Sequence, residues 1–351
     1  MAFCTNCGKE YEVVPVRCEC GSLFASVEPS ASNPALSPGL FDFTGEGGAL
    51  LVLYLKLIFL SIVTLGIYSF WGRTEIRRYL WANTRFAGQP FAYHGTGKEL
   101  FIGWLKLIGI WVGLTMSLAL LLIAGGDNLK PFAGLVLFAA FALLAPLAIH
   151  GAIRYRWSRT SWQGRHFVYN GDFKELAWIV IPGLFFTAIT FTIYLPVFLT
   201  NLRRYVTNHT HYGGHSFEFT GASTGLLGAY GKMLLLVVPT LGLYRFWFQS
   251  RQFNFYWCNT RFAGFPFRAS FDGLLLLMLT FTNVLLTTFT LGIGYPWAIC
   301  RTIRFVAANL QLEQLPRIQL AASATAGTSA FGDAIGDVIG TDAGIDAGFG
   351  L

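Results

Sequence analysis

Charged residues are scarce in this chain. They make up 12% of its 351 residues, about half of the share in ordinary globular proteins, whereas hydrophobic residues make up 54% and aromatic residues 16%. A chain with so few charges is not expected to fold as a water-soluble globular protein. The composition instead predicts that most of the chain lies in lipid.

Catalytic and nucleic-acid-binding patterns are missing too. The sequence has no G-x-S-x-G turn, no phosphate-cradling loop and no H-E-x-x-H motif. No Asp or Glu lies in the middle of a long apolar run, so no carboxylate relay for protons or sodium ions is visible. No basic stripe with interleaved aromatic residues lies outside these runs, so we expect no nucleic-acid partner. We also expect no enzyme, because no acid, base and nucleophile can be assembled.

Long apolar runs are what the chain does have. Crossing a hydrocarbon core takes about 20 residues, and six runs are long enough: residues 49–71, 100–125, 131–149, 176–199, 226–248 and 274–299. The first residues hold cysteines and acids instead of a basic stretch followed by an apolar one, so we expect no cleavable signal peptide. The predicted fold class is an all-α polytopic membrane protein.

The sequence also repeats itself. The stretch NTRFAGQPF at 83–91 returns as NTRFAGFPF at 259–267, and residues 41–91 align with residues 217–267 without a gap. Weaker copies follow at steps of 50 residues, and the second copy has 26 additional residues. Self-similarity at a fixed period is typical of stacked structural units. We therefore expect about six apolar segments arranged in 50-residue internal repeats.

Each repeat consists of an apolar segment, a bend such as TLGIYSFW, a basic amphipathic stretch and a short segment of the pattern GxxFx[FY]xG. Alternation of apolar and polar residues in QPFAYHG and HSFEFTG predicts short strands that end at glycine. Phe, Tyr and Trp crowd the bends and these strands, as expected where aromatic rings lie at head-group level. We expect the strands to lie at the membrane interface.

Two requirements on the number of crossings conflict. With one span in each repeat, successive basic stretches would alternate between the two sides of the membrane, against the preference of basic residues for the cytoplasmic side. With a helical hairpin in each repeat, all basic stretches would share one side, but about 33 residues are too few for two full crossings. Shallow or re-entrant hairpins would resolve the conflict, and the longer second repeat has room for two complete spans. We favour hairpins with a common cytoplasmic face, on which the N-terminus also lies.

Six basic residues are candidate contacts for an anionic head group or substrate. Three lysines share one depth, because each lies eleven residues after the glycine that closes the preceding strand: Lys56, Lys106 and Lys232. Three arginines open the recurring basic motif: Arg78, Arg154 and Arg204. A charge in a membrane segment is costly and therefore marks a functional candidate. The alternative is that the lysines snorkel to the interface and the arginines only anchor the protein to lipid head groups.

A histidine cluster, HTHYGGH, contains His209, His211 and His215. Histidines at this spacing could bind zinc. The equivalent positions of the other repeats are not histidine, which favours contact with lipid head groups instead.

The first 25 residues predict a small zinc-ribbon-like module. Cys4 and Cys7 form a CxxC pair and Cys18 and Cys20 a CxC pair, and each pair is followed by glycine. Four thiolates in two pairs could close a tetrahedral, structural zinc site. Two disulfides are the competing interpretation, favoured if this end faces an oxidising compartment. The domains expected are then the module at 1–25, a flexible linker at 26–40, a repeat-built transmembrane domain at 41–318 and a disordered Gly/Ala/Asp-rich tail at 319–351.

The motifs FxFTG, TLGIYSFW, RRYLWANTRFAG and FxYHGTGKEL occur in the chain, and most of them recur. Together they resemble the YjgN-like family of bacterial inner-membrane proteins, a domain of unknown function, across residues 41 to about 318. The resemblance implies a multi-pass protein of the bacterial inner membrane without an assigned reaction, substrate or catalytic residue. The zinc-ribbon-like head is an addition to the family pattern.

Three function classes remain open. The repeats and the intramembrane lysines favour transport or handling of an anionic small molecule or a lipid. The cysteine module favours a non-transporting scaffold or envelope protein that docks a protein partner. An enzyme is the least favoured class.

Topology can be tested with single cysteines at Asn83, Asn170, Asn208 and Asn259 in a cysteine-free background, with Cys4 reporting separately. We expect all four positions to react with a membrane-impermeant thiol reagent from the cytoplasmic side, because they lie beside the basic motifs. Labelling from alternating sides would show single spans instead, and both the common face and the lysine cluster would have to be abandoned.

Overall fold

The computed structural model describes residues 2–3, 10–11, 40–125 and 133–312. The chain divides into two compact parts, Met1–Gly39 and Leu40–Leu351, which are described separately. In the first part, strands β1 (Ala2–Phe3) and β2 (Glu10–Tyr11) pair antiparallel. The four cysteines predicted to bind zinc, residues 26–39 of the predicted linker and the predicted tail lie outside the described residues.

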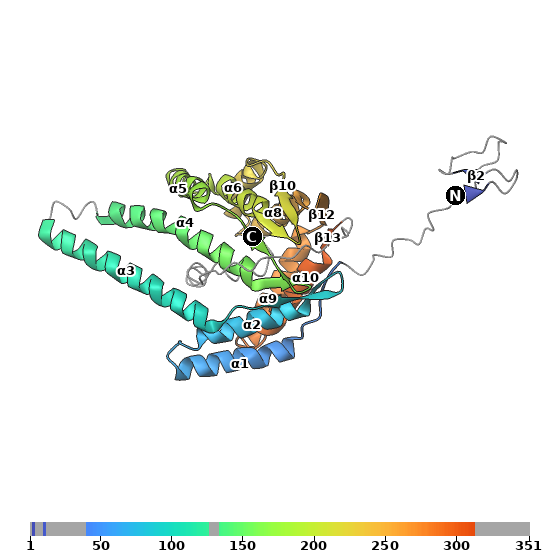
Figure 1. The fold of residues 1–351 in the computed structure, drawn as a ribbon, viewed down its shortest axis with the longest axis horizontal. Helices are drawn as coiled ribbons and strands as arrows, with labels where there is room; N and C mark the ends of the chain where they lie inside the picture. Colours follow the sequence, from blue (N-terminus) through green and yellow to red (C-terminus); the bar gives the residue numbers. More distant parts are fainter. Residues whose placement is uncertain (1, 4–9, 12–39, 126–132, 313–351) are drawn as a thin grey trace. The chain divides into compact units, whose positions relative to one another are not determined.

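The described second part contains five successive pairs of helices. The apolar runs of the sequence form most of the first helix of each pair, and the basic motifs lie on the second helix of each pair. Helices α3 and α4 are the longest and extend beyond the others (Figure 1). The pairs are α1 (Gly47–Val63) with α2 (Ser69–Asn83), α3 (Gly97–Gly125) with α4 (Ala133–Arg159), α5 (Phe173–Ile189) with α6 (Leu195–Asn208), α7 (Leu227–Val237) with α8 (Tyr244–Cys258), and α9 (Gly273–Phe289) with α10 (Tyr295–Ala308).

A tight turn joins the helices of the four short pairs. In the first turn, Leu65 and Gly66 have positive φ angles of 51° and 90°, and the Gly66 N–H donates to the Ser61 carbonyl at 2.7 Å. The Thr64 hydroxyl donates to the Leu60 carbonyl at 2.7 Å and accepts the Tyr68 N–H at 2.9 Å. The same pair of threonine bonds recurs at Thr190, Thr240 and Thr290. The predicted bend is therefore a turn that supplies its own partners for backbone groups freed where the helix ends.

A large apolar side chain stands exposed at each of these four turns. The residues are Leu65, Phe191, Leu241 and Leu291, and their exposed fractions lie between 88% and 94%. All four have positive φ, a conformation that costs a residue with a Cβ roughly 1–2 kcal/mol. The turns thus present an apolar side chain outward in spite of backbone strain.

Short strands flank every helix pair, and the first and last strand of each pair are hydrogen-bonded to each other. We call a helix pair with its two flanking strands a unit. The flanking strands are β3 (Phe41–Phe43) and β4 (Thr84–Phe86) in unit 1, β5 (Gln89–Tyr93) and β6 (Thr160–Trp162) in unit 2, β8 (Val168–Tyr169) and β9 (Thr210–Tyr212) in unit 3, β10 (His215–Phe219) and β11 (Thr260–Phe262) in unit 4, and β12 (Phe265–Ala269) and β13 (Leu310–Leu312) in unit 5. Strand β7 (Arg165–His166) pairs with β6. The antiparallel sheets are β3–β7 and β8–β13.

One backbone hydrogen bond closes the base of each unit. The residue that follows the first strand donates its N–H to the carbonyl at the end of the second helix, at 2.8–3.1 Å. The pairs are Thr44 with Asn83, His94 with Arg159, Asn170 with His209, Thr220 with Asn259, and Ser270 with Asn309. Both ends of every described helix pair therefore lie at its strand end, which is the hairpin arrangement.

The last unit, unit 5, packs against the first, unit 1. The second helix of a unit packs against the first strand of the next unit, as α2 packs against β5, and α10 packs in the same way against β3 of unit 1. Helix α10 also packs against α1, and the Arg304 guanidinium donates to the Gly45 carbonyl at 2.6 Å. Phe43, Leu50, Ile76, Cys300 and Ile303 form a buried cluster across this junction. Unit 5 therefore meets unit 1 much as neighbouring units meet each other.

Aromatic side chains from all five units meet at the strand ends. The buried cluster consists of Phe86, Phe91, Trp162, Phe167, Tyr212, Phe262, Phe267, Leu310 and Leu312. The buried Tyr212 hydroxyl donates to the Trp162 carbonyl at 2.7 Å, and burial raises the pKa of Tyr212 to about 12. The phenol therefore stays protonated at physiological pH and keeps this hydrogen bond.

The structure changes two expectations, the number of membrane crossings and the all-α fold class. In the described part of the chain, one helix, Gly97–Leu120, is long and apolar enough to cross a membrane, and Gly47–Val63, Leu227–Val237 and Gly273–Phe289 are shorter apolar helices. The six predicted crossings are therefore not shown, because turns divide four of the apolar runs. The chain is helix-rich as predicted, but the short strands of the second part assemble into two sheets. The pairings β4–β5, β6–β7, β9–β10 and β11–β12 are local hairpins. The two flanking strands of each unit, in contrast, are far apart in sequence, so the strand motifs alone could not reveal their pairing.

The packing of unit 5 against unit 1 can be tested by truncating a phenylalanine at this junction and the equivalent phenylalanine of another unit. Phe43 in β3 and Phe219 in β10 occupy the same position of units 1 and 4 and are 3% and 4% exposed. We expect Phe43→Ala and Phe219→Ala each to lower the free energy of unfolding by about 3–5 kcal/mol, the usual effect of emptying a buried phenylalanine site. Denaturation in detergent micelles, followed by tryptophan fluorescence, measures both. A much smaller loss for Phe43→Ala would contradict the packing of unit 5 on unit 1.

Candidate functional site

Lys56 forms an ion pair. Its ammonium lies 2.8 Å and 3.0 Å from the two carboxylate oxygens of Glu75, which lies on α2 of the same unit. The Tyr68 hydroxyl donates to the same carboxylate at 3.3 Å. The charge of Lys56 is thus neutralised within unit 1. Sequence reasoning missed Glu75, which lies in the basic stretch that follows the bend.

Lys106 on α3 and Lys232 on α7 are exposed. Neither forms an ion pair with any residue that the structure describes. The three lysines of the sequence pattern therefore divide into one neutralised ammonium and two that remain candidates for contact with an anion.

Arg78 and Arg204 hold neighbouring units together. The Arg78 guanidinium donates to the Gly95 carbonyl at 3.3 Å, and that of Arg204 donates to the Gly221 carbonyl. Arg304 makes the equivalent bond to Gly45 across the junction of units 5 and 1. Arg154, in contrast, is exposed and has no ion pair among the described residues. Contact of Arg78, Arg154 and Arg204 with an anion stays a prediction. The structure shows in addition that Arg78 and Arg204 position the neighbouring unit.

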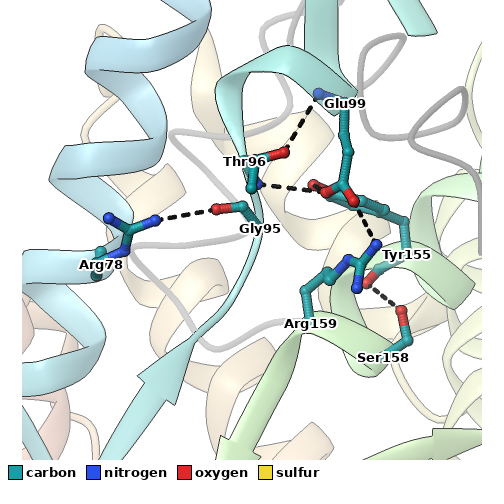
Figure 2. Close-up of polar contacts among 7 residues, drawn as sticks. All are labelled: Arg78, Gly95, Thr96, Glu99, Tyr155, Ser158 and Arg159. Carbon is teal, nitrogen blue, oxygen red and sulfur yellow. Dashed lines mark hydrogen bonds and ion pairs between the residues drawn. The ribbon is translucent and has the colours of Figure 1, made fainter. Parts of the chain in front are cut away.

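A carboxylate joins the two helices of unit 2 at their base (Figure 2). Glu99, in the first turn of α3, forms an ion pair with Arg159 at the end of α4 and accepts the Tyr155 hydroxyl at 2.9 Å. Glu99 and Thr96 also exchange side-chain-to-backbone hydrogen bonds of 3.3 Å and 3.4 Å, a capping box. In unit 3, Glu175 occupies the place of Glu99 and lies 3.4 Å from His209.

A cavity of about 310 Å³ lies between α5 and α6 of unit 3. Pro182 lines it and stands where units 1, 2 and 4 carry lysine, so no long cationic side chain fills the space. The polar lining residues are Glu175, Asn201, Arg204, Asn208 and His209. The remaining lining residues are Trp178, Ile179, Pro182, Gly183, Tyr194, Phe198 and Tyr205.

Two side chains with a formal charge line this cavity, the carboxylate of Glu175 and the guanidinium of Arg204. The guanidinium of Arg204 donates to Ser223 Oγ at 3.1 Å, and that hydroxyl donates to Asn201 Oδ1 at 2.6 Å. Arg204 has no carboxylate partner among the described residues, whereas the carboxylate of Glu175 faces His209. The cavity therefore offers a guanidinium that is not paired with Glu175, together with amide groups and an apolar wall. Sequence reasoning selected Arg204 but missed the cavity, whose signal was a proline at a lysine position.

The three clustered histidines separate in the structure. His209 ends α6 and contacts Glu175, while His211 and His215 lie on β9 and β10. Among the residues that the structure describes, no group of three or more metal-binding side chains is placed to hold an ion.

Another histidine lies beside the Arg78 contact. His94 Nε2 is 2.8 Å from Ser161 Oγ, and its ring centre is 5.1 Å from that of His166. Burial, followed by the nearby His166 and the guanidiniums of Arg78 and Arg159, lowers the pKa of His94 below its usual 6.5. His94 is therefore neutral at physiological pH and adds no charge here.

Sequence comparison identifies several relatives. Residues 38–245 and 222–338 match a family described as bacterial protein of unknown function (DUF898). The inner membrane protein YjgN of Salmonella typhimurium LT2 is 32% identical over 155 residues, which is 44% of this chain and 37% of that protein. The protein of the same name from Escherichia coli O157:H7 is 25% identical over 233 residues, 66% of this chain and 52% of that protein. The chain thus spans about half the length of these relatives or less.

No solved structure matches the chain. The two family matches together extend from residue 38 to residue 338 and include all five units. The chain therefore belongs to the DUF898 family of bacterial proteins of unknown function.

Proposed function

We propose that this chain is an integral, multi-pass protein of the bacterial inner membrane that binds an anionic amphiphile, as a step in the transport or handling of a lipid or lipid-like molecule. The relatives named inner membrane protein YjgN and the composition of the chain support the location. The observation that carries the binding is the α5–α6 cavity, whose lining combines the Arg204 guanidinium, not paired with a carboxylate, with apolar side chains.

The helix lengths support shallow hairpins around one deeper pair. Helices α1, α5 and α9 have 17 residues each and are about 25 Å long, less than the roughly 30 Å of a hydrocarbon core. Their exposed apolar turns suit a hairpin that enters lipid and returns, because the turn supplies its own hydrogen bonds. Helices α3 and α4 have 29 and 27 residues, enough to cross. The strand ends then share the cytoplasmic side with the N-terminus, in keeping with the basic motifs.

An amphiphile matches both parts of the cavity. The Arg204 guanidinium suits a phosphate or carboxylate, with which arginine makes strong charge-assisted bonds, while Ile179 and Phe198 suit an acyl chain or ring. Trp178 also lines the cavity and is 80% exposed, so a ligand can enter from the side. The aromatic cluster fills the centre of the strand ends, which favours lateral entry over a path between the units.

A second candidate function rests on the cysteines of the first part. A non-transporting scaffold would use the zinc-ribbon-like module, with Cys4, Cys7, Cys18 and Cys20 as ligands, to dock a protein partner. The spacing of the two pairs is the observation that favours it. The two candidates differ in whether they need the module, because binding in the cavity does not require it.

Cavity variants test the first candidate. Arg204→Gln removes the cation, and we expect affinity for phosphatidylglycerol in nanodiscs to fall about fivefold, since one charge near a membrane contributes about 1 kcal/mol. Ile179→Trp should reduce binding further by filling the cavity. The matched controls are Arg304→Gln, which loses the equivalent interunit bond, and Leu279→Trp, at the same place in unit 5. Equal binding by all four variants would refute the cavity as the site.

Deleting residues 1–30 separates the two candidates. A protein that binds amphiphiles through its hairpins keeps its phosphatidylglycerol affinity, whereas a scaffold loses the proteins that co-purify with the full chain. Metal analysis of the full chain should give about one zinc ion for each chain, lost on Cys4→Ser or Cys18→Ser. A metal-free, oxidised full chain would favour disulfides instead.

A further inference from the structure

In two units, the side chains at the same two positions contact each other across the paired helices. Lys56 on α1 meets Glu75 on α2 at 2.8 Å, and the two are 19 residues apart. In unit 5, Thr282 on α9 accepts a hydrogen bond of 3.1 Å from Arg301 on α10, at the same spacing. The spacing therefore marks two facing positions on the paired helices.

In unit 4, both facing positions carry a cation. Lys232 on α7 and Arg251 on α8 have the same spacing of 19 residues and align with Lys56 and Glu75. Helices α7 and α8 pack together, and the rings of Tyr230 and Phe248, close to the two cations in sequence, lie 5.4 Å apart between them. Unit 4 thus replaces the carboxylate of unit 1 by a guanidinium.

No carboxylate neutralises these two cations. Both side chains are exposed, and neither forms an ion pair with a described residue. The sequence contains no Asp or Glu between Glu218 and Asp272, so unit 4 has no acid on either of its helices. Two like charges at facing positions of paired helices repel one another, and lipid solvates them poorly. Such a pair is stabilised when an anion lies between the two groups.

We propose that Lys232 and Arg251 together bind the phosphate of an anionic phospholipid at the surface where α7 and α8 pack. The guanidinium can make two parallel hydrogen bonds to phosphate oxygens, and the flexible ammonium can reach a third. Arg301 lies at the equivalent position of the neighbouring unit and adds positive potential. This site lies in a different unit from the α5–α6 cavity and does not depend on it.

An exchange of residues between units 1 and 4 is the test. Arg251→Glu gives unit 4 the charges of unit 1, so the fold is expected to tolerate it, and Glu75→Arg gives unit 1 the charges of unit 4. In nanodiscs that contain phosphatidylglycerol in phosphatidylcholine, native mass spectrometry counts retained anionic lipids and a titration gives their affinity. We expect Arg251→Glu to weaken one site about thirtyfold, since it changes two charges near the membrane. We expect Glu75→Arg to add a site.

Further variants and a competition with inorganic phosphate complete the test. Arg251→Gln should weaken the same site less, by about fivefold, and serves if Arg251→Glu does not fold. Ile179→Trp, which fills the cavity and lies on α5, should leave this site unchanged, so the two sites can fail independently. Unchanged lipid retention in both Arg251 variants would overturn the proposal. Displacement of the lipid by millimolar inorganic phosphate would overturn a lipid as the source of the phosphate.

Discussion

The packing of unit 5 on unit 1 holds this architecture together. The short strands of the second part form two sheets, with β3 and β13 among their edge strands, and unpaired backbone groups at a sheet edge need partners. Helix α10 packs against β3, and Arg304 reaches the Gly45 carbonyl across 259 positions of sequence. Because unit 5 lies against unit 1 in this way, every described second helix has a first strand to cover, and the aromatic cluster receives side chains from all units.

The sequence predicted what is local in this fold. The copies of NTRFAG mark the point where a second helix passes into a strand, and the TLGIY motif marks the turn between helices. Both depend on residues within a few positions of each other, such as Thr64 with Leu60 and Tyr68. The pairing of the two flanking strands of each unit and the contact between units 5 and 1 join distant residues whose motifs indicate no partner, so they could not be predicted.

The candidate sites were predicted only in part, for a related reason. The sequence indicated that Lys56, Lys106 and Lys232 share one depth, but for Lys56 and Lys232 the facing charge comes from the second helix. Glu75 faces Lys56, and Arg251 stands at the corresponding position opposite Lys232. The spacing of 19 residues was available in the sequence but has no meaning until the two helices are known to pack. The cavity had an even weaker signal, a proline where other units carry lysine. In each case the informative residue is the one that departs from the shared pattern.

The unequal helices also have a consequence for the surrounding lipid. A 29-residue helix such as α3 is about 44 Å long, whereas α1, α5 and α9 are about 25 Å long. In the topology proposed above, α3 and α4 would reach through both leaflets, whereas the short hairpins would enter from one side and end before the other. The protein would therefore take up more area in the leaflet on the side of the strands than in the opposite leaflet, and would displace more lipid from it.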